Sequence, residues 1–195
     1  VDPIELPRTE ARLRLAGQGP DTLIVRRSNY AGLVRILGEL SWEGADVILA
    51  DLGVSSMQLD NPERGFTYKQ DGPLDLRMNP QRGESAAQWM DRASLATLET
   101  AFREYADEPR AREIASGLVA ARGRAPLRRT RAVADALRVI LAGVGRDAQD
   151  LAIRRVFQAL RIADNDALGV IEAILPRAID LVQPGGRLAV ISFHS

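Results

Sequence analysis

The sequence of 195 residues contains no cysteine, a single histidine and a single lysine, Lys69. Without cysteine the chain cannot form a disulfide bond and offers no thiolate to a metal ion. This composition fits a reducing compartment, and we therefore expect a cytoplasmic protein.

Long hydrophobic runs are also missing. No stretch reaches the roughly 18 consecutive apolar residues of a membrane span, so we expect no membrane segment. The first residues, Val1-Asp2-Pro3, show neither a basic nor an apolar leader. Hydrophobic residues still make up 46% of the chain, which is enough for the core of one large domain or of one domain with an insertion.

The net charge is zero, but positive and negative residues are unevenly distributed. Residues 1–100 carry 11 basic and 15 acidic side chains, a net charge of −4, whereas residues 101–165 carry 13 and 8, a net charge of +5. The positive region contains a cluster of arginines: Arg122, Arg124, Arg128, Arg129 and Arg131. Clustered arginines are typical of phosphate binding, and equally of a solvated helical surface, so charge alone leaves both open.

The first quarter of the chain alternates between helical and strand patterns. Hydrophobic spacing predicts helices over residues 4–17 and 30–40, a strand over 22–25, and a buried strand over 47–51. Such alternation indicates a parallel, doubly wound α/β sheet.

From residue 85 to about residue 165 the pattern is helical throughout. The expected helices are Ala86–Met90, Ser94–Tyr105, Ala111–Ala121, Arg131–Ala142 and Asp150–Ile162. Ser94 and Thr130 are predicted helix caps. A further helix is expected over 167–182, then a tight Pro184-Gly185-Gly186 turn and a buried strand over 187–193 that returns to the sheet.

A signature stretch follows the strand that ends at Asp51. It begins Asp51-Leu52-Gly53-Val54-Ser55-Ser56 and continues through Glu63-Arg64-Gly65-Phe66 to Asp71-Gly72-Pro73-Leu74-Asp75-Leu76-Arg77-Met78. In open α/β sheets, ligands bind at the carboxyl ends of strands. A long loop that mixes glycine, charge and apolar residues favours a segment that shapes a site over a plain surface loop.

This stretch resembles the MraW/RsmH family, the S-adenosylmethionine-dependent methyltransferases that modify cytosine N4 in 16S ribosomal RNA. Three further regions agree with the family: the helical middle, Phe157-Gln158-Ala159-Leu160-Arg161-Ile162, and the run from Pro184 to Ser195. The resemblance covers nearly the whole chain. Two local departures are Leu151-Ala152, where the family often has His-Pro, and Asp164-Asn165, where it commonly has Val-Asn.

The resemblance implies a Rossmann-like class I methyltransferase sheet with an all-helical insertion domain. On this basis we predict a methyltransferase domain from residues 1–84 and 166–195, and an RNA-recognition insertion over 85–165. Members of the family carry a glycine-rich cofactor loop upstream, so we expect this chain to be a fragment that lacks it.

The family also implies a cofactor, S-adenosylmethionine, and residues that contact it. Asp2 stands where an acid would bind the ribose hydroxyls, although an aspartate before proline is equally typical of a helix N-cap. Tyr30 stands near adenine in the family, where its ring could stack on the base, or it is a core aromatic at a helix start. Asp51 and Gln58 complete the implied cofactor set.

Two residues are candidates for catalysis, Asp51 and His194. Asp51 ends a strand next to the expected position of the cytidine amine. His194 lies in Ser192-Phe193-His194-Ser195 after the last strand, although a lone histidine is usually structural or exposed. The absence of cysteine excludes the covalent route used for cytosine C5. No metal is required, because the cofactor carries its own leaving group. Many amino-methyltransferases have an Asp/Asn-Pro-Pro-aromatic motif here, and this chain has Asp-Leu-Gly-Val instead, which leaves the amine contacts open.

Further residues are predicted to contact the RNA substrate. Those next to the strand end and in the signature loop are Ser55, Ser56, Asp71, Asp75 and Arg77, and those in the helical region are Arg128, Arg129, Arg154 and Arg161. The alternatives are that the serines cap the next segment and that the loop acids pair internally. Phe157 and Leu160 are predicted core residues.

The function predicted from the sequence is therefore N4 methylation of a cytidine in 16S ribosomal RNA, with the small ribosomal subunit as partner. The alternative is a catalytically inactive RNA-binding or ribosome-assembly module, and cofactor binding separates the two. A DNA amino-methyltransferase is disfavoured by the missing motif, and a small-molecule methyltransferase by the arginine-rich middle. Homodimer formation is left open.

Overall fold

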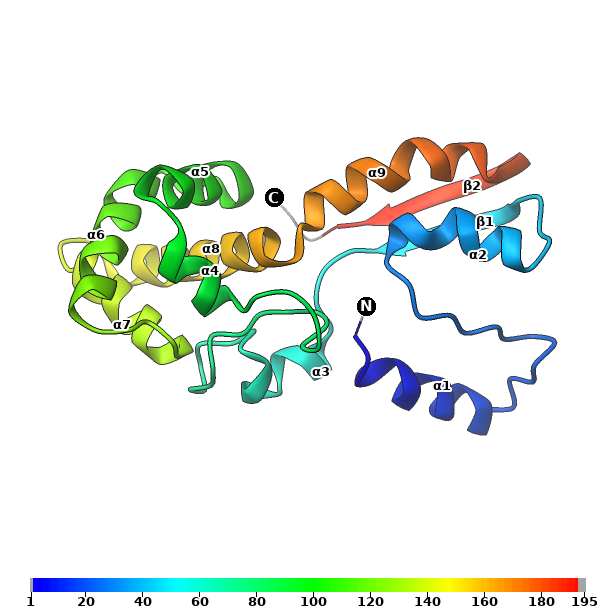
Figure 1. Cartoon of the computed structure of the whole chain (residues 1–195), viewed down its shortest axis with the longest axis horizontal. Coiled ribbons are helices and arrows are strands. Elements are labelled where there is room, and N and C mark those ends of the chain that lie inside the picture. Colours follow the sequence, from blue (N-terminus) through cyan, green and yellow to red (C-terminus); the bar gives the residue numbers. More distant parts are fainter. Residues whose placement is uncertain (1, 193–195) are drawn as a thin grey trace. The chain divides into compact units, whose positions relative to one another are not determined.

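A computed structural model describes residues 2–192, and the chain divides into two compact units (Figure 1). The strand unit consists of Val1–Val54 and Ala167–Ser195, and the helical unit of Ser55–Asp166. The architecture is mixed, with many helices and a small parallel sheet. Among residues 2–192, no helix is both long and apolar enough to cross a membrane.

Two parallel strands form the sheet of the strand unit, β1 (Ala45–Asp51) and β2 (Val182–Ile191). Val47 pairs with Arg187 and Asp51 with Ile191, so both strands end at the same edge. The helices of this unit are α1 (Glu5–Leu15), α2 (Leu33–Glu39), α9 (Ala167–Asp180) and the 3-10 turn η1 (Tyr30–Gly32). The prediction that the last strand returns beside the strand of Asp51 is confirmed.

The strand predicted over residues 22–25 is wrong: these residues form no strand. A strand needs a partner for its backbone groups. Here the Arg14 guanidinium takes that place, donating to the Leu23 carbonyl oxygen at 2.8 Å and to that of Gly19 at 2.7 Å.

The predicted Pro184-Gly185-Gly186 turn is also wrong, because β2 already begins at Val182 and includes all three residues. They form an irregular start to the strand, where the pairing register shifts between Ala45 and Val47. Gly185 has a φ of +85°, and a Cβ at Gly186 would lie 2.6 Å from the Asp46 carbonyl oxygen. Glycine therefore permits the close approach of the two strands.

The prediction that both strands are buried is wrong as well. Val47 and Leu49 of β1 are 63% and 62% exposed, and Val190 and Ile191 of β2 are exposed too. Since residues at i and i+2 share a face, Val47, Leu49 and Asp51 line one apolar face that ends in a carboxylate. None of the described residues buries this face.

Seven elements make up the helical unit, and Figure 1 labels its α-helices α3 to α8. They are α3 (Ser56–Leu59), η2 (Pro62–Arg64), α4 (Ala86–Arg92), α5 (Leu95–Ala106), α6 (Ala111–Arg124), α7 (Thr130–Ile140) and α8 (Arg146–Asn165). Each of the five helices predicted in this region is present. The twenty-residue α8 is the longest, and α4, α5 and α7 all pack against it.

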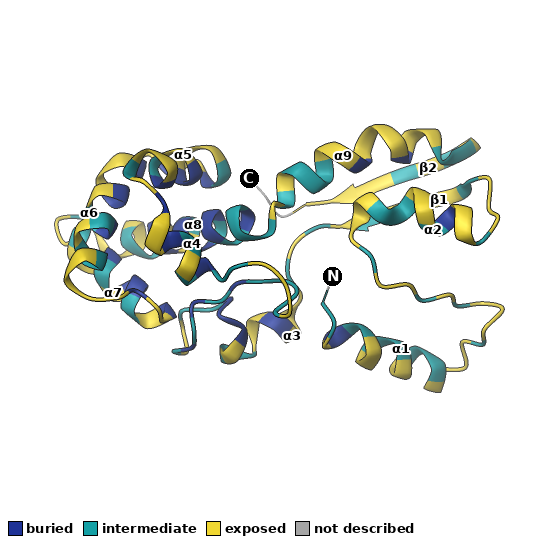
Figure 2. Cartoon of the chain, in the orientation of Figure 1, coloured by how far each residue is buried: buried dark blue, intermediate teal, exposed yellow. Residues whose placement is uncertain are grey.

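The core of the chain lies in this unit, on the facing sides of α5 to α8 (Figure 2). Residues spaced three or four apart on each helix point inward, as expected for amphipathic helices. The fully buried side chains include Leu98, Phe102, Ile114, Leu118, Val133, Leu137, Ile153 and Leu160. Phe157 is 5% exposed and its ring contacts that of Tyr68, so the predicted core positions of Phe157 and Leu160 are confirmed.

One of the two predicted helix caps is correct. Ser94 caps α5, since its Oγ accepts from the Thr97 main-chain N–H at 3.1 Å. Thr130 does not cap α7 but is its first residue, and its Oγ accepts from the Gly72 N–H at 3.1 Å and donates to the Gln70 carbonyl oxygen at 3.2 Å. The hydroxyl therefore joins the helix to the signature loop.

This junction changes the expected boundary between the two parts of the chain. We predicted that residues 55–84 belong with the strands, but they form one compact unit with the helices. Hydrogen bonds between the signature loop and the start of α7 account for this grouping: the Leu74 N–H donates to the Arg128 carbonyl oxygen at 2.8 Å, and the Thr130 N–H to that of Gly72 at 2.9 Å.

Candidate functional site

Asp51 is the last residue of β1 and its carboxylate is exposed. Strand pairing holds the backbone on both sides of it, because the next residue, Leu52, donates to the Ile191 carbonyl oxygen at 2.9 Å. Gly53 then has a φ of +126°, which turns the chain away from the sheet. A carboxylate thus stands fixed at the carboxyl edge of a parallel pair of strands.

Tyr30 lies beside Asp51 in the strand unit. Its phenol donates to the Asp51 main-chain oxygen at 2.8 Å, although the two residues are 21 positions apart. Burial, and then the negative charge of Asp51, raise the pKa of the phenol above its ordinary value. Tyr30 therefore stays protonated and donating at neutral pH, and the structure brings together two of the four predicted cofactor residues.

Asp2 takes part in the start of α1. Its Oδ1 accepts from the main-chain N–H groups of Ile4 at 2.9 Å and Glu5 at 3.3 Å. These contacts are those of a helix N-cap, which is the alternative that the sequence left open.

Gln58 and Ser55 form a capping box at the start of α3 in the helical unit. The Ser55 N–H donates to Gln58 Oε1 at 3.0 Å, and Gln58 Nε2 lies 3.5 Å from the Met78 sulfur. Gln58 is 6% exposed, whereas Ser55 and Ser56 are exposed. The geometry therefore gives Gln58 and Ser55 a capping role, and Ser56 presents its side chain to solvent.

The first acid of the signature loop binds an arginine of the helical region. Asp71 Oδ2 accepts from Arg129 Nε at 2.7 Å, and Asp71 Oδ1 accepts from the Arg131 N–H at 3.3 Å. The hydrogen bond from Arg129 is the main cause of a lowered pKa at Asp71. This acid and Arg129 were both predicted to contact substrate, and the structure brings them together as a pair.

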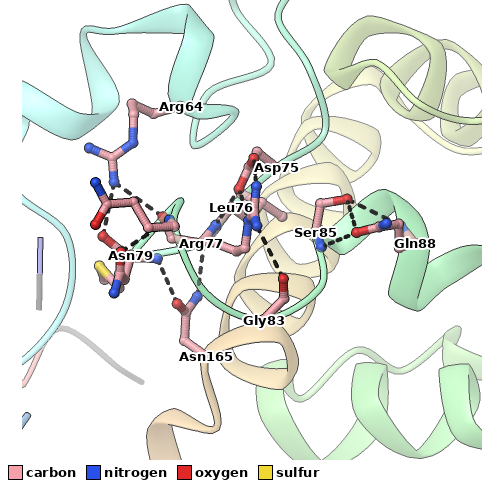
Figure 3. A network of polar contacts seen from close by, with 11 residues as sticks. Arg64, Asp75, Leu76, Arg77, Asn79, Gly83, Ser85, Gln88 and Asn165 are labelled. Atoms are coloured by element: carbon pink, nitrogen blue, oxygen red, sulfur yellow. Dashed lines mark hydrogen bonds and ion pairs between the residues drawn. The ribbon is translucent and has the colours of Figure 1, made fainter. Parts of the chain in front are cut away.

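The second acid, Asp75, is paired within the loop itself (Figure 3). Arg77 donates from Nε to Asp75 Oδ1 at 2.8 Å and from Nη2 to Asp75 Oδ2 at 2.7 Å, a two-pronged ion pair. Its Nη1 also donates to the Gly83 carbonyl oxygen at 3.1 Å. Internal pairing, the alternative that the sequence left open for the loop acids, is present at Asp75, and it fixes the side chains of Asp75 and Arg77 relative to each other.

The model of the MraW methylase family matches residues 2–195. The chain belongs to this family. Among curated relatives, the ribosomal RNA small subunit methyltransferase H of Heliobacterium modesticaldum is 42% identical over 195 residues, which are 100% of this chain and 61% of the relative. That of Acidithiobacillus ferrooxidans is 42% identical over 97% of this chain and 58% of its own length. The chain therefore spans about three fifths of these family members.

The four arginines of the helical region that were predicted to bind RNA differ in their surroundings. Arg128 is exposed, and its side chain has no ion pair among residues 2–192, while Arg129 is held by Asp71. Arg154 is exposed on α8, but Arg161 is half-buried, and burial lowers the pKa of its guanidinium. Arg128 and Arg154 are thus the arginines of this set with guanidinium groups available to an anion.

Asp164 lies near the end of α8, and its surroundings are unusual. Both carboxylate oxygens are buried and accept no hydrogen bond from any described residue. Burial, and then repulsion from Asp75, raise the pKa of this carboxyl to about 7, against the opposing charge of Arg77. Asp164 is therefore a buried carboxyl group, unsatisfied by the described residues, that interacts electrostatically with the Asp75–Arg77 pair.

Sequence reasoning missed two residues that hold the family's signature loop in shape, Arg64 and Asn165. Arg64 is 6% exposed and donates to two loop carbonyl oxygens, and Asn165 bonds the loop from the end of α8. Arg64 stands between Glu63 and Gly65 in a polar stretch, so its burial gave no local signal. Asn165 gave none, since its partner Leu76 is 89 positions away.

The remaining predicted residue, His194, lies outside the described residues. Within residues 2–192, no group of three or more acidic or histidine side chains is placed to hold a metal ion.

Proposed function

We propose that this protein is an S-adenosylmethionine-dependent methyltransferase that modifies the N4 amine of a cytidine in 16S ribosomal RNA. The family match over residues 2–195 carries the proposal. The β1–β2 pair is then part of a Rossmann-like sheet, and residues 85–165 are a helical insertion that recognises RNA. The alternative of an inactive RNA-binding module has no observation in its favour.

The chemistry of Asp51 and Tyr30 fits the cofactor. An exposed carboxylate at the end of a parallel strand accepts hydrogen bonds from hydroxyl or ammonium groups, both of which S-adenosylmethionine carries. The ring of Tyr30, whose phenol is tied to this strand end, offers a face to adenine. When bound, the cofactor supplies an electrophilic methyl group. Asp2 and Gln58 remain predicted cofactor contacts, although their side chains already make helix-capping contacts.

In this proposal Asp51 also acts on the acceptor. The lone pair of the cytidine N4 amine is delocalised into the ring, so transfer depends on alignment of the amine. An Asp51 carboxylate oxygen accepts an amine N–H, which holds the nitrogen in place and draws its proton toward the acid as the new bond forms. Positioning of this kind contributes up to about 7–11 kcal/mol in favourable model reactions.

The RNA is held, in this proposal, by the signature loop together with the arginine segment, residues 122–131. Pro73 and Arg129 form an isolated antiparallel bridge, and Asp71 binds Arg129. The loop predicted to face the target base and the segment predicted to bind phosphate are therefore one connected structure. Arg128 and Arg154 supply positive charge to the phosphates, which dominate nucleic-acid affinity.

The test is methyl transfer by the natural full-length protein to 16S RNA in small subunits, with the modified nucleoside identified by mass spectrometry. We expect N4-methylcytidine, reduced at least about 100-fold by Asp51→Asn because the charged acceptor is lost. The matched control is Asp46→Asn, an exposed acid at the other end of β1, which should leave the rate unchanged. Methylation at another atom, or equal loss in both variants, would contradict the proposal.

RNA binding provides a second prediction. Arg128→Ala should weaken binding and reduce the slope of log K against log salt by about one, since one phosphate contact is lost. Arg138→Ala is the control, because this α7 arginine pairs with Asp135 three residues earlier. The readout is fluorescence anisotropy at several salt concentrations. An unchanged slope in Arg128→Ala would remove the arginine segment from the RNA surface.

A further inference from the structure

We propose that Asn165 is a positioning residue for methyl transfer: together with Arg64, it holds the backbone of Asp75–Met78 in the shape that receives the target base. The proposal rests on the proposed function for the identity of that base. It goes beyond it in assigning a role to Asn165 and Arg64, which are not among the residues predicted to contact cofactor or RNA.

The backbone of this segment is not in an ordinary conformation. Leu76 has a φ of +61°, in the left-handed region that side-chain-bearing residues rarely adopt. Its side chain is nevertheless 1% exposed, so packing fixes it in the core. A segment in a rare conformation persists only when its surroundings hold it there.

Asn165 supplies part of that hold from the end of α8 (Figure 3). Its Nδ2 donates to the Leu76 carbonyl oxygen at 2.8 Å, and its Oδ1 accepts from the Met78 N–H at 2.7 Å. The same Nδ2 donates to the Arg161 carbonyl oxygen at 2.9 Å, which anchors the amide to its own helix. An amide with its donor and acceptor both engaged replaces the backbone partner that a strand would provide.

Arg64 holds the next two carbonyl groups. Its Nη2 donates to the Arg77 and Met78 carbonyl oxygens, both at 3.1 Å. Its own carbonyl oxygen accepts from the Leu76 N–H at 3.2 Å. The guanidinium also lies over the Phe66 ring, 5.6 Å from its centroid. Three successive carbonyl groups of the segment are thus held by just two side chains.

These contacts act through the backbone and leave the functional groups of the segment turned elsewhere. The Arg77 guanidinium takes no part in the hydrogen bonds from Asn165 and Arg64 given above, and it binds Asp75 and the Gly83 carbonyl oxygen. Loss of Asn165 therefore alters where the Asp75–Arg77 pair stands, without removing any charged group from it. That distinguishes positioning from direct contact with the substrate.

The experiment compares Asn165→Ala and Asn165→Asp with a matched control, Gln158→Ala, in the natural full-length protein. Gln158 is also a half-buried amide on α8, and its Nε2 donates to the Tyr105 carbonyl oxygen at 3.3 Å, away from the segment. Asn165→Asp is nearly the same size and keeps the acceptor for Met78, but it loses the donor to Leu76.

We expect Asn165→Ala to exchange the Met78 amide hydrogen at least tenfold faster and to lower kcat at least tenfold, with the Kd of S-adenosylmethionine unchanged. Asn165→Asp should lower kcat as much with a smaller change in exchange, and Gln158→Ala should alter neither. Faster exchange with an unchanged kcat, or equal effects in Gln158→Ala, would overturn the proposal. Absence of methyl transfer by the natural protein would instead contradict the proposed function. Exchange of the Met78 amide hydrogen would still show whether Asn165 holds the segment.

Discussion

The two units of the chain differ most in what they bury. In the helical unit, α5 to α8 enclose a dense core, and Leu98, Phe102 and Ile114 have no exposed surface. In the strand unit few side chains are buried, and Val47 and Leu49 of β1 remain more than half exposed. The helical unit therefore holds the stabilising packing among the described residues, while the strand unit presents its apolar face and its carboxylate.

The acidic side chains of the two units differ in a similar way, since those of the signature loop are paired and that of Asp51 is exposed. Asp71 and Asp75, in the helical unit, are each paired with an arginine, so the loop is fixed before any ligand binds. Asp51, in the strand unit, is exposed and close to a donating phenol. The loop acids are thus held in ion pairs, whereas the Asp51 carboxylate is exposed, as its proposed role requires.

Large-to-small substitutions should reveal most strongly the difference in side-chain burial between the two units. Phe102→Ala removes a fully buried ring and should lower the free energy of unfolding by about 3–5 kcal/mol. Leu49→Ala removes a side chain that is 62% exposed and should cost less than about 1 kcal/mol in this chain. Urea denaturation followed by circular dichroism measures both, and similar costs would refute the comparison.

Asp164 provides a second test of the comparison between the two units, because its buried carboxyl group accepts no hydrogen bond from any described residue of the well-packed helical unit. Its pKa is raised from 3.8 to about 7, so between these values the folded chain keeps a proton that the unfolded chain loses. Stability should therefore fall as pH rises through this window and level off above about pH 7. Allowing for partial exposure, the loss is on the order of 2 kcal/mol.

Two variants separate the effect of the titrating carboxyl group from the effect of burying polar atoms. Asp164→Val, which replaces the buried carboxyl by an apolar side chain, should remove the pH dependence and stabilise the chain at pH 8. Asp164→Asn should also remove the pH dependence, but with a smaller gain, because its polar atoms stay buried. The readout is thermal unfolding between pH 4 and pH 8, and an unchanged pH profile in both variants would contradict the assigned burial.

The sequence was informative wherever structure depends on neighbours along the chain. Hydrophobic spacing predicted each helix from α4 to α8, and Ser94 was a correct cap because capping involves residues three positions apart. Burial of β1 was predicted wrongly, since burial depends on what packs against the strand. The strand over 22–25 failed for a similar reason: no partner strand adjoins it.

The position of Asp51 at a strand end was predictable, but the contacts among the candidate site residues were not. The signature motif placed Asp51 at a strand end, and the structure agrees. The pairing of Asp71 with Arg129 spans 58 positions, and that of Asn165 with Leu76 spans 89, so no local pattern revealed them. Such long-range contacts determine which acidic side chains form ion pairs within the fold.

The most direct test of the account is calorimetric binding of S-adenosylmethionine to Asp51→Ala and Asp46→Ala, each in this chain and in the natural full-length protein. We predict that the full-length protein binds, that Asp51→Ala abolishes binding, and that Asp46→Ala leaves the Kd unchanged. Undiminished binding by Asp51→Ala would contradict the assigned role of the strand end, and no binding by the folded full-length protein would contradict the methyltransferase itself.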